Sequence, residues 1–229
     1  MREIVFDTET TGLDPYKGDR VVEIGCVELY NTIPTGQTFH VYLDPERDMP
    51  DEAFRVHGLS REFLTGKPLF AAVVEDFLGF IGEDSRLIAH NAEFDMRFIN
   101  AELERVGRPK IQADRIIDTL VLARRRHPGA SNSLDALCAR YGVDTSRRTK
   151  HGALLDSELL ADVYAELIGG RQAALSLTEH VAAAKEEVLV AVGDRPEALA
   201  SAITAQESEA HAAFIAKMGD KAIWMKYRS

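Results

Sequence analysis

The chain has 229 residues with 45% hydrophobic residues and a formal net charge of −10, which is typical of one folded domain with an added segment. The acidic balance argues against a free-standing nucleic-acid-binding module but leaves room for an enzyme whose carboxylates hold metal ions. No run approaches the roughly 18 apolar residues that span a bilayer, and the apolar run after Met1 is too short for a signal peptide. Because two cysteines cannot form a disulfide framework, we expect free thiols and a cytoplasmic protein without membrane contact.

Strand patterns come first along the chain. Apolar or alternating runs at 4–6, 21–29 and 39–43 are separated by turn residues and predict three strands. Helical spacing then appears at 70–81, 91–106, 131–141 and 154–168, and short apolar runs at 87–89 and 116–117 predict two more strands. Strands followed by alternating strands and helices predict an α/β domain, with a mixed five-stranded sheet covered by helices.

The composition changes after Gly169-Gly170, which ends the last helical pattern. Residues 170–229 are rich in alanine. We therefore predict a folded domain over 1–169 and a C-terminal tail over 170–229, helical in part and otherwise flexible.

The first candidate site follows the first strand. Asp7 and Glu9 are two positions apart, so in a strand both carboxylates face the same way. Carboxylates held close together repel and must be protonated, solvated or bridged by a cation, and Mg²⁺ or Mn²⁺ suits such oxygen ligands. A solvated strand end would explain this pair equally well if it stood alone.

Two further segments carry acids at the starts of predicted helices. Asp95 lies in the segment His90-Asn91-Ala92-Glu93-Phe94-Asp95, where an acid in the first turn could simply complement the helix dipole. Asp156 lies beside the apolar stripe of the last helix, and His151 precedes it by five residues, in a loop that includes Gly152. A single histidine of this kind is usually an ordinary surface or core residue.

Together, the three segments are far more specific. Asp-Thr-Glu-Thr-Thr-Gly, His-Asn-Ala-Glu-Phe-Asp and His-Gly-Ala-Leu-Leu-Asp resemble, in this order, the three motifs of the DnaQ-like 3′→5′ exonucleases in their His-containing subgroup, DEDDh. The resemblance covers essentially all of 1–169. It implies a ribonuclease-H-like sheet and a metal-dependent exonuclease.

The resemblance also implies roles for individual residues. Asp7, Glu9 and Asp156 would bind two divalent cations directly, Asp95 would complete the metal site partly through water, and His151 would be the general base. In the replicative members, residues resembling Glu52 and His57 approach the terminal nucleotide, together with Asp7, Glu9 and Asp156. Leu13 resembles the apolar residue that wedges against the terminal base, although His57 could also be an ordinary turn histidine.

The C-terminal tail helps to distinguish among the members of this family. Residues 172–177 resemble the Gln-x-x-Leu-x-Leu motif that docks on the sliding clamp, which makes Gln172, Leu175 and Leu177 candidate clamp contacts. Its place after the exonuclease domain resembles the epsilon subunits of bacterial DNA polymerase III. Residues 170–205 would then hold this motif and a tether.

Helical spacing returns near the end of the chain, and 206–229 would be an anchor for the polymerase alpha subunit. Its apolar contacts would be Phe214, Ile215, Met218 and Trp224. The resulting expectation is a proofreading subunit that acts on a single-stranded or frayed DNA 3′ end within a DNA-directed DNA polymerase. An RNA-trimming exonuclease, an assembly factor with a vestigial site, and a further small theta-like subunit stay open.

Overall fold

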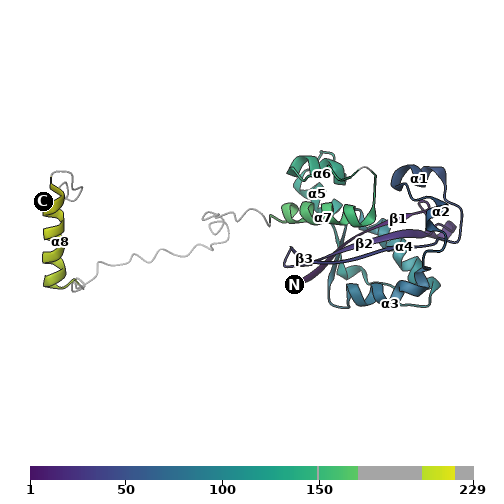
Figure 1. The fold of residues 1–229 in the computed structure, drawn as a ribbon, viewed down its shortest axis with the longest axis horizontal. Helices are drawn as coiled ribbons and strands as arrows, with labels where there is room; N and C mark the ends of the chain where they lie inside the picture. The colour runs from purple at the N-terminus through teal and green to yellow at the C-terminus, as the bar shows by residue number, and fades with distance from the viewer. Residues whose placement is uncertain (149, 170–202, 220–229) are drawn as a thin grey trace, which may run out of the picture. The chain divides into compact units, whose positions relative to one another are not determined.

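A computed structural model describes residues 1–148, 150–169 and 203–219 (Figure 1). The chain divides into two units, with the boundary between Leu175 and Ser176. The first unit contains every described strand, and its elements are β1 (Arg2–Thr10), η1 (Pro15–Lys17), β2 (Val21–Tyr30), β3 (Ile33–Tyr42), α1 (Asp51–His57), α2 (Arg61–Leu64), α3 (Phe70–Ile81), β4 (Arg86–Ala89), α4 (Ala92–Arg105), η2 (Ala113–Arg115), β5 (Ile116–Asp118), α5 (Thr119–Arg126), α6 (Leu134–Tyr141) and α7 (Ala153–Leu167).

The strands form one mixed sheet in the order β3-β2-β1-β4-β5. β1 pairs antiparallel with β2, in a register that sets Asp7 opposite Gly25 and Glu9 opposite Glu23. On its other side β1 runs parallel to β4, which in turn runs parallel to β5. The carboxyl ends of the parallel strands β1, β4 and β5 therefore lie at the same end of the sheet, where Asp7 and Glu9 are found.

Alternation along the central strands separates two apolar cores. Ile4 and Phe6 of β1 pack in a core that includes residues of α3 and α4, whereas Val5 packs in a core with residues of α7. Figure 1 shows α3 and α4 on one side of the sheet and α5, α6 and α7 on the other. Because side chains alternate along a strand, Asp7 and Glu9 share the face of Val5, toward α7.

The predicted mixed five-stranded sheet with flanking helices is confirmed. The largest differences from the predicted boundaries are in three elements: β1 continues to Thr10, so Asp7 and Glu9 lie inside the strand, β3 begins at Ile33, and α6 begins at Leu134. The start of β3 escaped the pattern because this edge strand is exposed on both faces through Thr38. The short helices α1, α2 and α5 were also not predicted.

The second unit contains the predicted tail helix, α8 (Ala205–Met218). Thr204 caps it, since its hydroxyl accepts from the backbone N–H of Glu207 while the Glu207 carboxylate accepts from the backbone N–H of Thr204. Ile215 is buried, whereas Phe214 is 61% exposed and Met218 is partly exposed. No described helix is long and apolar enough to cross a membrane.

Candidate active site

The start of α7 lies directly against β2, and this contact sets the position of Asp156. A side-chain carbon on Gly25 would lie 2.2 Å from the backbone nitrogen of Leu154, so only glycine permits this approach. The Ser157 hydroxyl donates to the Gly25 carbonyl at 2.9 Å. Since Gly25 lies opposite Asp7, the packing brings the first turn of α7 over the β1 carboxylates.

Asp95 reaches the same place from the other side of the sheet. It lies in the first turn of α4, after Asn91 turns the chain through a left-handed conformation with φ of 64°. The backbone N–H and the hydroxyl of Thr8 both donate to Asp95 Oδ1, at 3.0 and 2.7 Å. Thr8 thus ties the third acidic segment to the strand that carries Asp7 and Glu9.

Burial and neighbouring carboxylates raise the proton affinity of Asp7, Glu9 and Asp95. Burial, then the neighbouring carboxylates of Asp95 and Glu9, raises the pKa of Asp7 well above its usual range. Burial and then Glu23 raise the pKa of Glu9 to about 8. Burial raises the pKa of Asp95 to about 7, against the opposing effect of its hydrogen bonds from Thr8. Such a buried group of like charges needs protons or a cation.

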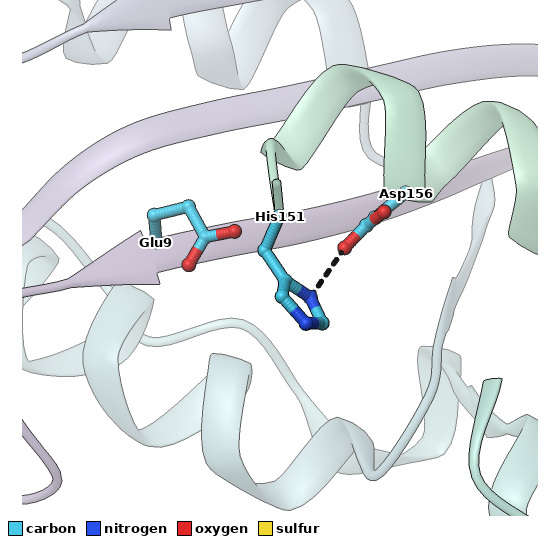
Figure 2. A group of neighbouring side chains, drawn as sticks. All are labelled: Glu9, His151 and Asp156. Carbon is cyan, nitrogen blue, oxygen red and sulfur yellow. Dashed lines mark hydrogen bonds and ion pairs between the residues drawn. The ribbon is translucent and has the colours of Figure 1, made fainter. Parts of the chain in front are cut away.

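Three potential ligand groups are particularly close. One ligand atom from each of Glu9, His151 and Asp156 lies within 4.8 Å of the other two. Figure 2 shows Glu9 projecting from β1 toward His151, which precedes α7, with His151 Nδ1 3.1 Å from Asp156 Oδ2. The predicted ligands Asp7 and Asp95 lie outside this tight group, although Asp95 raises the pKa of Glu9 and Glu9 raises the pKa of Asp7.

The donor set fits hard divalent cations. Its oxygen ligands are carboxylates, the type that Mg²⁺ and Mn²⁺ prefer. A bound cation would offset the repulsion between these carboxylates. His151 is half-exposed at the edge of the group, where it can reach water.

A cleft of about 640 Å³ adjoins the acids. Four of the six predicted nucleotide-binding residues line it, namely Glu9, Leu13, Glu52 and His57, whereas Asp7 and Asp156 do not. Leu13 is 79% exposed. His57 is the last residue of α1, and its side chain is buried. Its Nδ1 accepts a hydrogen bond from the backbone N–H of Leu59 at 3.0 Å. Burial lowers the pKa of its imidazole.

Arg148 is a site residue that sequence reasoning missed. Its Nη2 donates to Asp156 Oδ2 at 2.7 Å, and its Nε lies 2.6 Å from Asp156 Oδ1. The same Nη2 lies 2.6 Å from His151 Nδ1. The one sequence signal was its position, three residues before His151.

The tail contacts are separate from this site. Gln172, Leu175, Leu177 and Trp224 lie outside the described residues. Phe214, Ile215 and Met218 all lie on α8, as predicted.

Known proteins show the same organisation. The sequence profile of the family RNase_T, described as exonuclease, matches residues 4–164. The chain belongs to this exonuclease family. Its sheet and flanking helices are accordingly of the predicted ribonuclease-H-like type.

Three similar proteins are notable. The DNA polymerase III subunit epsilon of Rickettsia conorii (strain ATCC VR-613 / Malish 7) is 48% identical over 223 residues, covering 95% of this chain and 96% of the relative.

The corresponding subunit of Escherichia coli (strain K12) is 48% identical over 177 residues, which are 74% of this chain and 72% of the relative. A solved structure of exonuclease X in complex with 5′ overhanging duplex DNA superposes with a TM-score of 0.57 at 24% identity, over 73% of this chain and 91% of that chain. As a member of this family, the exonuclease domain is metal-dependent.

Proposed function

We propose that this chain is the 3′→5′ proofreading exonuclease subunit, epsilon, of a bacterial DNA polymerase III. The observation that carries the proposal is the convergence of five residues from β1, α4 and the start of α7 on one edge of the sheet, namely Asp7, Glu9, Asp95, His151 and Asp156. The similarity to epsilon subunits over nearly the whole chain supports the assignment to the replicative polymerase.

In this proposal two divalent cations, Mg²⁺ or Mn²⁺, are held by Asp7, Glu9 and Asp156, with Asp95 contributing partly through water. When bound, such ions lower the pKa of a coordinated water and stabilise charge on the phosphate. His151 accepts the proton of the attacking water, since a neutral imidazole near the reacting atoms is a suitable base at physiological pH. The water oxygen bonds to phosphorus, the bond to the 3′ oxygen breaks, and a nucleoside 5′-monophosphate leaves.

The adjoining cleft would select the end of the strand. Leu13 would wedge against the terminal base, while Glu52 and His57 would approach the terminal nucleotide. Only an unpaired nucleotide can enter, and unpairing costs a few kcal/mol and costs least at a mismatch. The same geometry therefore favours removal of misincorporated nucleotides.

The remaining parts of the chain would hold the complex together. Gln172, Leu175 and Leu177 would bind the sliding clamp, and Phe214, Ile215, Met218 and Trp224 would bind the polymerase alpha subunit. A tether between them keeps the exonuclease at a high effective concentration near the primer end. Activity at the bacterial chromosome would place the protein in the cytoplasm.

A cleavage assay with Mg²⁺ tests the proposal. We expect faster release of a mismatched than of a paired 3′-terminal deoxynucleotide, and little activity with Asp7→Asn. Preference for RNA would favour the RNA-trimming alternative, and no hydrolysis of either substrate would favour an assembly factor with a vestigial site. Co-purification with the polymerase alpha subunit separates a replicative subunit from a free exonuclease.

A further inference from the structure

Arg148 occupies the centre of the site as a buried cation. Its side chain is 8% exposed, and it sits in the segment that joins α6 to α7. The guanidinium donates from Nη2 to Asp156 Oδ2, and its Nε forms an ion pair with Asp156 Oδ1 at 2.6 Å without a second hydrogen bond. Its Nη1 also pairs with Asp135 of α6, so the group is anchored from a second helix.

Arg148 also contacts the imidazole of His151. The guanidinium Nη2 lies 2.6 Å from His151 Nδ1, and the same ring nitrogen lies 3.1 Å from Asp156 Oδ2. The guanidinium therefore stands against both the carboxylate and the ring that the proposed reaction uses.

We propose that Arg148 is an internal counter-ion that closes the metal-free site, and that its guanidinium must leave Asp156 before a divalent cation can bind there. This inference rests on the metal site proposed above. Departure of the guanidinium frees a carboxylate of the metal site and also removes its contact with His151. Arg148 is thus a positioning residue of the metal-free site.

Competition of this kind has a measurable signature. The apparent affinity for a ligand falls by the fraction of protein in the competent state, so a closed state populated about 90% of the time weakens binding about tenfold. We therefore expect Arg148→Gln to bind Mn²⁺ on the order of tenfold more tightly than the parent chain in calorimetry. In chelator the same variant should melt at a lower temperature, because Asp156 loses its partner, and saturating Mn²⁺ should recover most of the difference.

Arg147 provides the matched control. It lies one residue away, and its side chain is 72% exposed and pairs with Glu158 of α7 at 2.9 Å. Arg147→Gln removes the same charge near the site and should leave Mn²⁺ affinity within about twofold of the parent. Arg148→Lys keeps the charge but replaces the guanidinium with a single ammonium, so it should bind Mn²⁺ more tightly than the parent and less tightly than Arg148→Gln.

Each outcome is decisive. Arg148→Gln could lower the melting temperature but bind Mn²⁺ no more tightly than the parent. Arg148 would then only hold its loop against α6 and α7, and the proposal would be overturned. If Arg148→Gln does not fold, equal Mn²⁺ affinity of Arg148→Lys and the parent overturns it instead. Failure of the parent chain itself to bind Mn²⁺ would reject the metal site and the proposed function, not the competition alone.

Discussion

Replacing Glu9 with Gln is expected to stabilise the metal-free protein at alkaline pH. Glu9 is a buried carboxyl whose pKa is raised from its ordinary 4.5 to about 8, first by burial and then by Glu23. A carboxyl with a higher pKa in the folded than in the unfolded protein stabilises the fold below its unfolded pKa. This contribution is lost as pH rises through the folded value. Glutamine has a similar shape and carries no charge at any pH.

The size of the effect follows from the pKa. Each pKa unit corresponds to about 1.4 kcal/mol, so between pH 5 and pH 8 Glu9 alone would lower the free energy of unfolding by about 3–4 kcal/mol. The pKa values of Asp7 and Asp95 are raised as well, and protons retained on these two carboxyls lessen the repulsion that an ionised Glu9 meets. We therefore expect a net gain of about 2 kcal/mol for Glu9→Gln at pH 8, or roughly 4–8 °C in melting temperature for a domain of this size.

Thermal melts in chelator at pH 5 and pH 8 measure this difference. The two proteins should melt together at pH 5 and separate at pH 8, whereas the exposed control Glu83→Gln should follow the parent at both values. In saturating Mn²⁺ the order should reverse, because the variant lacks a ligand. Parallel melting curves of the parent and Glu9→Gln across this range would refute the idea that Glu9 belongs to a repelling carboxylate cluster.

Three further predictions concern other parts of the chain. His151→Ala should slow hydrolysis by about 10²–10⁴, the range for loss of a general base, and keep Mn²⁺ binding in calorimetry; loss of the metal would make His151 a ligand instead. Gly25→Ala should destabilise the fold by about 1–3 kcal/mol and reduce cleavage, because its methyl group meets the backbone of Leu154; Gly79→Ala, with open space around it, is the control in melts and assays. Deleting 206–229 should leave cleavage of single strands unchanged and abolish co-elution with the polymerase alpha subunit in gel filtration, and undiminished co-elution would show that the anchor lies elsewhere.

Local pattern was sufficient to predict the acids and the elements that carry them. The spacing of Asp7 and Glu9 matches the alternation of a strand, and the apolar stripe of 154–168 predicts α7 with Asp156 at its start. These features depend on residues close in sequence, whose periodicity is visible in the chain itself. Three motifs in one order then indicated the family.

The sequence by itself therefore determined the five strands, the longer helices and the acidic residues that they carry. Only the tertiary structure decided how these groups meet. Gly25 permits the approach of α7, Thr8 holds Asp95, and Arg148 pairs with Asp156 across the site. None of these contacts has a periodic signature, because each depends on the packing of one element against another. Packing also made the acids unusual, since burial and proximity, which no local pattern specifies, raise the pKa values of Asp7 and Glu9.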